Sequence, residues 1–278
     1  MNELQKEILK VFKEFQNVCM ANNLRYFAIG GTCLGAVRNK GFIPWDDDLD
    51  VAMPFEDYEK FRSIANKYIK NPYKLLDFEE TQHCRCLFLK MHNTETTFIE
   101  EDVKQFPDRY TGVFIDIMPI VGFPEHAAFL HKLKCFYHIK LNLARRFKLR
   151  EKRKLFSNVI VLCASVLYAR KQFNYYSKRF ERLIGKYRFG ETEQVFFPWR
   201  IPITPPYKNV FPYTVFEESI SVSFEDTTIL VPREYDTYLT MDFGDYMKLP
   251  PEEKRISRHA TEVIDLQKSY KEYWRKEK

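Results

Sequence analysis

Apolar residues recur every three or four positions through the first twenty residues of the chain. They fall on one face of a helix: Leu4, Ile8, Val11, Phe12, Phe15, Val18 and Cys19. This spacing is the signature of an amphipathic helix that buries one side. The pair Asn22-Asn23 follows and predicts the end of the helix.

The pattern then changes to short apolar runs separated by turn residues. Residues 26–29 predict a strand that runs into Gly30-Gly31, and Thr32 is expected to cap a short helix over 33–38. Residues 48–53 predict the next strand, and residues 55–69 predict a helix after Pro54. The chain therefore begins with alternating helices and strands.

Three further runs predict strands over residues 84–91, 96–100 and 112–118. Strands and helices that alternate in this way predict an α/β (α+β) fold with a mixed-sheet core over residues 1–124. No internal repeat and no low-complexity segment interrupts this part of the sequence.

The composition of the chain shifts after Pro124. Residues 125–190 predict a helical segment, in which residues 155–169 contain twelve apolar positions out of fifteen. Residues 191–278 form a third, loop-rich part with a strand pair over 219–231. A helix is expected between Pro232 and Gly244, because proline favours helix starts and glycine favours helix ends.

Positive charge is concentrated in the predicted helical segment. The 278 residues carry a net charge of +6, but residues 131–154 hold ten Lys or Arg against a single Glu. That segment accounts for +9, so the rest of the chain carries about −3. Because the basic charge is local, a nucleic-acid partner does not follow from the net charge, and we expect none.

Cysteine usage and hydropathy favour a cytoplasmic protein. The first sixteen residues alternate charged and apolar positions, and no apolar run reaches the roughly 18–20 residues of a membrane span. The six cysteines include no C-x-x-C pair, so we expect reduced thiols. His83, Cys84, Cys86 and His92 could surround a zinc ion, but their spacing matches no standard zinc pattern.

The sequence after Trp45 places four carboxylates within five positions. Asp46, Asp48 and Asp50 alternate along the predicted strand and therefore share one face. Converging carboxylate oxygens suit Mg²⁺, with Mn²⁺ as an alternative. A calcium-binding EF-hand loop is excluded, since Val51 and Asp57 stand where it needs Gly and Glu. A solvated acidic turn stays an alternative.

Gly30 and Gly31, followed by Thr32, form a second candidate element between a strand and a helix. Their spacing matches neither the Walker loop nor the dinucleotide-binding fingerprint. Adjacent glycines at the start of a helix let backbone N–H groups approach a phosphate closely. The acidic strand follows 17 to 19 residues later, which strengthens the interpretation of a phosphate site.

Asp116 supplies a third acid on another predicted strand. Ile115 and Ile117 flank it, and a lone carboxylate in an apolar strand is costly without a cation or hydrogen bonds. Asp48, Asp50 and Asp116 together predict a metal site for phosphoryl transfer. The motifs of zinc proteases, serine hydrolases and dithiol enzymes do not occur in the sequence.

Three segments resemble a known family. Residues 26–53 read YFAIGGTCLGAVRNKGFIPWDDDLDVAM, residues 114–119 read FIDIMP, and residues 243–251 read FGDYMKLPP. These segments are similar to motifs of the LicD family, the phosphorylcholine transferases related to fukutin-type proteins. Two positions depart from the family pattern: Cys33 stands where Leu is usual, and Arg258-His259 stands where a His pair is common.

The resemblance implies a nucleotidyltransferase (polymerase-β-like) fold with a helical insertion. It implies Mg-dependent transfer of a phosphoalcohol from a CDP-alcohol, most often CDP-choline, to a hydroxyl of a cell-surface glycan or teichoic-acid-type acceptor, with release of CMP. Asp48, Asp50 and Asp116 match the metal and catalytic acids of the family, and Asp46 matches its supporting acid. His259 is expected to bind substrate.

The residues themselves add further expectations for the substrates. Arg38 and Lys90 are candidate phosphate contacts beside the backbone of Gly30 to Thr32. A choline head group favours an aromatic cage. The sequence offers Trp45, Trp199, Tyr207 and Tyr246 for it without choosing among them. The acceptor glycan is either lipid-linked or free.

Two other function classes are compatible with the basic segment. The protein could be a polymerase-type nucleotidyltransferase that acts on RNA, with residues 131–154 gripping phosphates. It could also be a noncatalytic module on a membrane surface. In the enzyme interpretation, residues 131–169 are expected to attach the protein peripherally to the inner membrane surface, through clustered charge followed by apolar side chains.

Overall fold

The fold is described from a computed structural model. It covers residues 1–77, 88–101, 103–104, 110–123, 170–198, 209–257 and 259–274, and side chains are described for all of these except 170–176 and 274. The structure confirms a mixed α/β fold. The predicted division of the chain into three parts stays a prediction.

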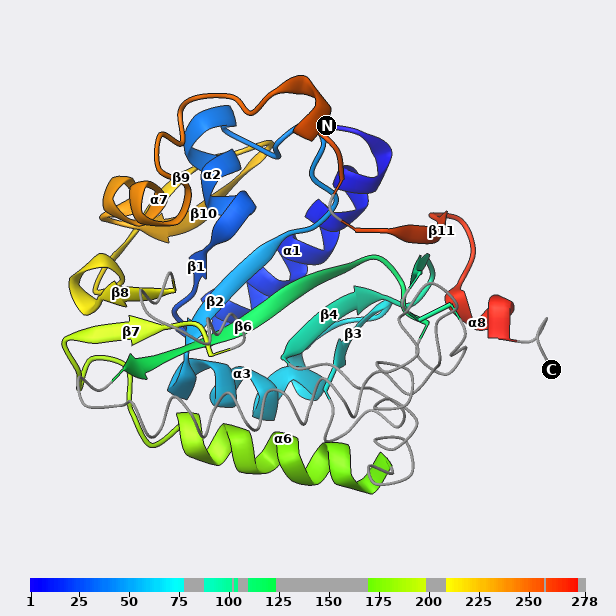
Figure 1. The fold of residues 1–278 in the computed structure, drawn as a ribbon. Coiled ribbons are helices and arrows are strands. Elements are labelled where there is room, and N and C mark those ends of the chain that lie inside the picture. The colour runs from blue at the N-terminus through cyan, green and yellow to red at the C-terminus, as the bar shows by residue number, and fades with distance from the viewer. Residues whose placement is uncertain are drawn as a thin grey trace, which may run out of the picture.

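A twisted mixed sheet forms the centre of the molecule (Figure 1). Its order is β1-β2-β6-β4-β3, and β7 pairs with β6 while β8 pairs with β7. The strands of this sheet are β1 (Phe27–Ala28), β2 (Asp50–Pro54), β3 (Tyr73–Leu76), β4 (Leu89–Asn93), β6 (Phe114–Phe123), β7 (Gln194–Phe196) and β8 (Val210–Pro212). Among the strands that the structure describes, only β2 and β6 run parallel, and this pair brings the two acidic strands together.

In the described part of the chain, several helices pack around this sheet and the β9–β10 hairpin, and one lies near the C-terminus. They are α1 (Glu3–Ala21), α2 (Gly30–Asn39), α3 (Phe55–Tyr68), α7 (Tyr235–Phe243) and α8 (Tyr270–Trp274). The helix α6 (Arg170–Ile184) lies beside α3 (Figure 1). The Arg62 guanidinium of α3 donates to both carboxylate oxygens of Glu181 in α6, at 2.7 and 3.1 Å.

The remaining strands form two separate pairs. The strands β9 (Ser219–Phe224) and β10 (Thr227–Pro232) make an antiparallel hairpin above β1. The strand β11 (Thr261–Asp265) pairs with β5 (Thr97–Glu100). Through this second pair, the C-terminal segment lies beside residues 97–100.

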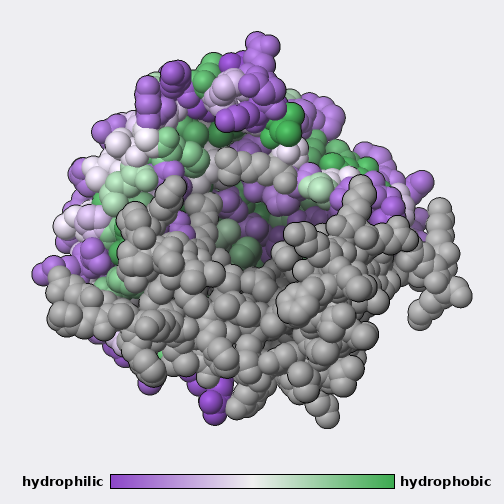
Figure 2. Space-filling model, viewed as in Figure 1, coloured by the Kyte–Doolittle hydropathy of each residue, from purple (hydrophilic) through white to green (hydrophobic). Residues whose placement is uncertain are grey.

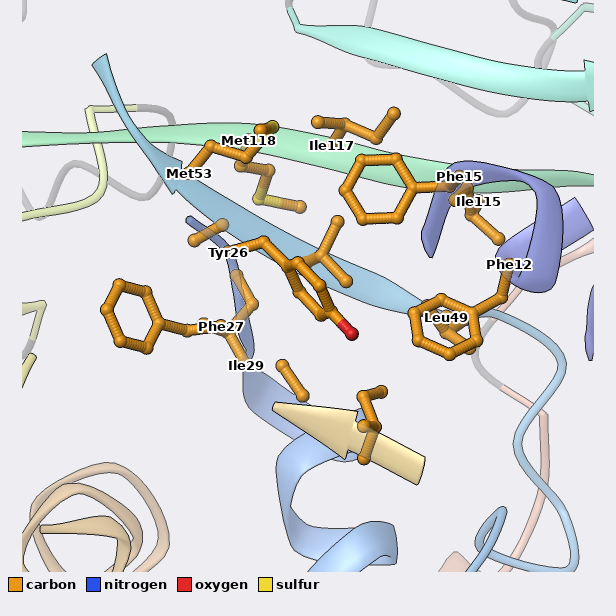
Figure 3. Packing of buried hydrophobic residues seen from close by; sticks show 14 of the residues in the cluster. Phe12, Phe15, Tyr26, Phe27, Ile29, Leu49, Met53, Ile115, Ile117 and Met118 are labelled. Atoms are coloured by element: carbon orange, nitrogen blue, oxygen red, sulfur yellow. The ribbon is translucent and has the colours of Figure 1, made fainter. Parts of the chain in front are cut away.

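Aromatic side chains fill the core between α1 and the sheet (Figure 3). The rings of Phe15 and Tyr26 meet edge to face with centroids 5.2 Å apart, a favourable arrangement for aromatic pairs. The helix begins with a capping box, in which Asn2 and Gln5 each accept from the other's backbone N–H. Leu49 and Val51 are fully buried, as the alternation of the acidic strand predicts.

Several predicted boundaries are corrected by the structure. Ile29, without a side-chain cap, precedes α2, and Gly30 and Gly31 form the first turn of that helix. Thr32 does not cap the helix, because its hydroxyl accepts from the N–H of Asp50 at 2.8 Å. Pro232 ends β10 and does not begin a helix. The hairpin of residues 219–231 and the helix that ends at Gly244 are confirmed.

The basic segment and most of the zinc candidates lie outside the described residues. Residues 131–169, His83, Cys84 and Cys86 are among them, and only His92 is described. His92 is buried, and its Nδ1 accepts from the N–H of Gly112 at 3.1 Å. Among the helices that the structure describes, none has the length and apolar composition to cross a bilayer. In the coloured part of Figure 2, hydrophilic residues lie along the upper rim, with hydrophobic areas between them.

Candidate active site

Two predicted acids and a lysine lie side by side across three neighbouring strands. Asp50 of β2 is the register partner of Asp116 in β6, and Asp116 is in turn the partner of Lys90 in β4. Register partners present their side chains on the same face of a sheet. The Nζ of Lys90 lies 3.0 Å from Oδ1 of Asp116 and 3.5 Å from the centroid of the Phe114 ring.

Asp48 adds a third carboxyl to this face. Burial raises the pKa of the Asp48 carboxyl, and the neighbouring charges of Asp116 and Asp47 raise it further against the opposing effect of His259. Burial also raises the pKa of Asp116, which Lys90 partly offsets. The side chains of Asp48 and Asp116 are 22% and 10% exposed, so water screens their repulsion only in part.

This face has the donor chemistry for a divalent cation. In the part of the chain that the structure describes, no three His, Cys, Asp or Glu side chains converge as a finished metal site. Lys90 accounts for this at Asp116, where its ammonium group already supplies a positive charge. Three partly buried carboxyls that repel one another are stabilised by a hard cation, so Asp48, Asp50 and Asp116 fit Mg²⁺ or Mn²⁺.

The first turn of α2 approaches the acidic segment closely. A Cβ at Gly31 would lie 2.6 Å from Oδ2 of Asp46, so a larger residue there would displace the Asp46 carboxylate. Gly30 has a φ of +54°, and its N–H donates to the hydroxyl of Tyr238 at 2.8 Å. The N–H groups of Gly31 and Thr32 belong to the first turn of the helix, where helical N–H groups have no partner within the helix.

The segment before β2 is held by the N-terminal helix. Gln5, which is 2% exposed, donates from Nε2 to the carbonyl oxygens of Ile43 at 3.0 Å and Asp46 at 2.9 Å. Thr32 fixes the other end through the N–H of Asp50. These contacts hold the acidic segment in position before β2 begins. The apolar periodicity of the sequence did not indicate this role of Gln5.

Asp47 binds the C-terminal segment. Its carboxylate accepts from the hydroxyl of Ser257 and from Nδ1 of His259, the latter at 3.0 Å. Burial by itself raises the pKa of Asp47, but the hydrogen bonds from His259 and Ser257 lower it overall. The sequence pattern did not indicate a role for Asp47, whose two partners lie more than 200 residues away.

His259 lies among three carboxylates. Besides Asp47, its Nδ1 is 3.9 Å from Asp48 and its Nε2 is 3.8 Å from Glu100. The hydrogen bond with Asp47 raises the pKa of His259 to about 9, against the opposing effect of burial. His259 is therefore a cation at neutral pH that reaches the predicted metal acids.

A cavity of about 660 Å³ opens between α2, the acidic segment and the residues after α7. Asp46, Asp48 and Asp50 line one part of it, and Gly31 and Arg38 line another. Its wall also contains residues that the sequence did not single out as site residues: Asp242, Phe243, Asp245, Lys248 and Lys254. In the sequence, the similarity of residues 243–251 to a family motif was the feature that pointed to this part of the cavity wall.

Arg38 lies at this cavity as expected, with Nη1 donating to the carbonyl oxygen of Tyr246 at 3.0 Å. Lys90 contacts Asp116, so its predicted contact with a phosphate has no separate support in the geometry. Lys248 and Lys254 add two further positive charges to the cavity wall. Small-molecule sites fall in this range of volume and carry a few polar groups among apolar ones.

Comparison with known proteins agrees with this geometry. Residues 23–142 match the model of the LicD/FKTN/FKRP nucleotidyltransferase domain, which includes the glycine pair and all the predicted metal acids. The chain is 28% identical over 278 residues to the lipopolysaccharide cholinephosphotransferase LicD of Haemophilus influenzae, covering 96% of this chain and 98% of that protein. Residues 23–142 therefore carry a LicD-type domain, and nearly the whole chain is similar to a LicD protein.

Shorter matches extend to two further proteins. The chain is 28% identical over 114 residues to the human ribitol 5-phosphate transferase FKRP, covering 39% of this chain and 23% of FKRP. It is also 30% identical over 106 residues to an uncharacterized protein of Rickettsia typhi, covering 37% of this chain and 34% of that protein. The two named relatives are transferases with different phosphoalcohols in their names.

Proposed function

We propose that this protein transfers phosphocholine from CDP-choline to a hydroxyl of a cell-surface glycan or teichoic-acid-type acceptor and releases CMP. The observation that carries the proposal is the alignment of Asp50, Asp116 and Lys90 across three strands, beside a cavity lined by Asp48 and the start of α2. Similarity over nearly the whole chain to a cholinephosphotransferase supports choline as the alcohol.

In this proposal, the cavity binds the donor by its diphosphate. The N–H groups of Gly31 and Thr32 face the phosphates at the positive end of the α2 dipole. Arg38 and the two lysines of the cavity wall, Lys248 and Lys254, balance the remaining negative charge. Asp46 fixes the distance between this helix and the acids, because its carboxylate contacts Gly31.

Asp48 and Asp50 would hold Mg²⁺, with Asp116 completing the set. When bound, the cation neutralises charge on the diphosphate and on the leaving CMP. The acceptor oxygen attacks the phosphorus that bears choline, and the bond from that phosphorus to the CMP oxygen breaks. CMP leaves with the electron pair, and the carboxylate of Asp116 accepts the proton of the acceptor hydroxyl. Lys90 favours the ionised form of Asp116 for this step.

His259 and Asp47 have a positioning role in this account. Their hydrogen bond closes the C-terminal segment against the acidic segment, and the charge of His259 offsets that of Asp48. The sheet and the position of its acids are compatible with a polymerase-β-like nucleotidyltransferase core, which we also propose. We place the reaction at the cytoplasmic side of the membrane, where a lipid-linked acceptor would be within reach of residues 131–169.

A donor panel tests this function. The purified protein is incubated with Mg²⁺, a glycan or teichoic-acid fraction, and either CDP-choline, CDP-glycerol or CDP-ribitol, and CMP is measured. We expect the fastest release from CDP-choline and none in EDTA. Asp226→Asn is the matched control for acid substitutions, since this side chain is 66% exposed and forms an ion pair with the exposed Lys13. Release from CDP-ribitol alone would overturn the choline assignment, and release from no donor would overturn the transferase assignment.

A further inference from the structure

Three aromatic side chains line the cavity on the side formed by the acidic segment and the residues after α7. Trp45 comes from the segment before β2, Phe243 ends α7, and Tyr246 follows it. All three pack against the core and are only partly buried, so part of each ring is open to the cavity. The two other aromatics that the sequence offered for a cage, Trp199 and Tyr207, lie outside the described residues.

The electrostatic character of this aromatic wall suits a cation. The Cζ of Arg255 lies 5.8 Å from the centroid of the Trp45 ring, within the range in which a ring face attracts positive charge. Asp242 and Asp245 line the cavity next to these rings. Aromatic faces and carboxylates together stabilise a positive group that has no hydrogen to donate, because ring quadrupoles and charge act without hydrogen bonds.

The ring of Tyr246 is fixed in place from two sides. Its hydroxyl donates to Oδ1 of Asp236 at 2.6 Å, and its carbonyl oxygen accepts from Arg38 at 3.0 Å. The same residue therefore links the aromatic wall to a candidate phosphate contact. A phosphocholine group has a negative phosphate and a positive ammonium on one short chain, which matches the neighbouring basic and aromatic parts of this cavity.

We propose that Trp45, Phe243 and Tyr246, with the carboxylates of Asp242 and Asp245, form the subsite for a quaternary ammonium group of the donor. The proposal rests on the proposed function, since it assigns the choline end of CDP-choline to a place in the same cavity. It also gives a physical basis for choosing choline over ribitol. A polyol needs hydrogen-bond donors and acceptors at every hydroxyl, which ring faces do not supply.

Calorimetric titration of the full chain with CDP-choline and CMP tests the subsite. Trp45→Leu should weaken CDP-choline binding roughly 3- to 30-fold and leave CMP binding unchanged, since a ring–cation contact contributes about 0.5–2 kcal/mol. Tyr246→Leu should act in the same way, whereas Tyr246→Phe keeps the ring and should bind CDP-choline nearly as well as the wild type. Equal losses for CDP-choline and CMP would mean that the rings stack on cytosine, and that would overturn the proposal.

A neutral analogue separates charge from shape. The CDP ester of 3,3-dimethylbutanol replaces the ammonium nitrogen by carbon at nearly the same size, and wild-type protein should bind it roughly 3- to 30-fold more weakly than CDP-choline. Asp245→Asn, at an exposed position, should weaken CDP-choline binding by up to about fivefold at low salt and leave binding of the neutral analogue unaffected. Equal binding of the two esters by the wild type would overturn the subsite.

The same measurements distinguish failure of the subsite from failure of the proposed function. If Trp45→Leu and Tyr246→Leu bind CDP-choline as tightly as the wild type and still release CMP, the function stands and the subsite is wrong. If the wild type binds CDP-ribitol in preference to CDP-choline, both the choline donor and its subsite are wrong. Thermal unfolding of each variant shows whether a loss of binding reflects a loss of folded protein.

Discussion

Removing the ammonium group of Lys90 should destabilise the protein in the absence of a divalent cation. Lys90 and Asp116 form an ion pair at 3.0 Å, with side chains that are 15% and 10% exposed. In Lys90→Met the new side chain can still pack on the Phe114 ring, but the Asp116 carboxylate loses its positive partner. Breaking a buried pair by removing one partner costs about 3 kcal/mol, so we expect a loss of that order in the free energy of unfolding.

A divalent cation should reverse much of this loss. In our account, the cation binds the same carboxylates and supplies the charge that the lysine variant lacks. At a Mg²⁺ concentration about 100 times its dissociation constant, binding to the folded state alone adds about 2.7 kcal/mol. Mg²⁺ should therefore stabilise Lys90→Met more than the wild type, in which Lys90 and the cation share Asp116.

Urea unfolding in EDTA and in Mg²⁺ measures both effects. Lys13→Met is the matched control, because Lys13 forms an exposed pair with Asp226 and should cost at most about 1 kcal/mol in either buffer. The double variant Lys90→Met/Asp116→Asn should come within about 1 kcal/mol of the wild type in EDTA, since no charge is left unpaired. If Lys90→Met is as stable as the wild type in EDTA, or if Mg²⁺ stabilises neither protein, the assignment of these carboxylates to a cation is wrong.

Four further predictions follow from other parts of the molecule. Asp116→Ala should lower kcat far more than it raises the KM for the donor, and a change confined to KM would move Asp116 to a binding role. Gly31→Ala should weaken CMP binding, because its Cβ would come 2.6 Å from Asp46 Oδ2, and unchanged calorimetric affinity would show that this approach does not shape the cavity. Burial lowers the pKa of His92 to about 3, so the unfolded chain binds a proton below pH 6.5 that the folded chain does not. Through this group, the free energy of unfolding should therefore fall by about 1.4 kcal/mol for each pH unit as the pH drops from 6.5 toward 3. In His92→Gln, urea unfolding should show a pH dependence that lacks this contribution. The wild-type protein should cosediment with anionic vesicles at low salt and less at raised salt through residues 131–169, and protein left in the supernatant at low salt would contradict membrane attachment.

The periodic parts of the fold could be predicted from the sequence. Burial of Leu49 and Val51 beside partly exposed Asp48 and Asp50 follows from strand alternation, which depends only on local geometry. The amphipathic pattern of α1 gave its buried face for the same reason. Asp116 could be placed on a neighbouring strand because an isolated acid among isoleucines needs a partner, and the register with Asp50 confirms that placement.

Contacts between distant segments could not be predicted. Asp47 meets Ser257 and His259 only because β11 pairs with β5, and strand pairing over such separations leaves no local pattern. The contact of Lys90 with Asp116 likewise depends on the register of β4 on β6, and the predicted contact of Lys90 with a phosphate stays a prediction.

Short-range chemistry was also misread at one position. Thr32 is of a residue type that is common at helix caps, but its hydroxyl accepts from the backbone N–H of Asp50, a tertiary contact across 18 residues. A residue type that suits a cap indicates only a capacity to accept a hydrogen bond. Which donor it meets depends on the fold around it.

The most direct test of the account follows the phosphorus atoms of the donor. Wild-type protein, Asp50→Asn and the control Asp226→Asn are each incubated with CDP-choline, Mg²⁺ and a glycan or teichoic-acid fraction as acceptor, and ³¹P NMR separates CDP-choline, CMP and the transferred or hydrolysed phosphocholine. Our account predicts equal amounts of CMP and phosphocholine product from the wild type and the control, no product in EDTA, and almost none from folded Asp50→Asn. Undiminished product from Asp50→Asn, or product formed equally well in EDTA, would contradict it.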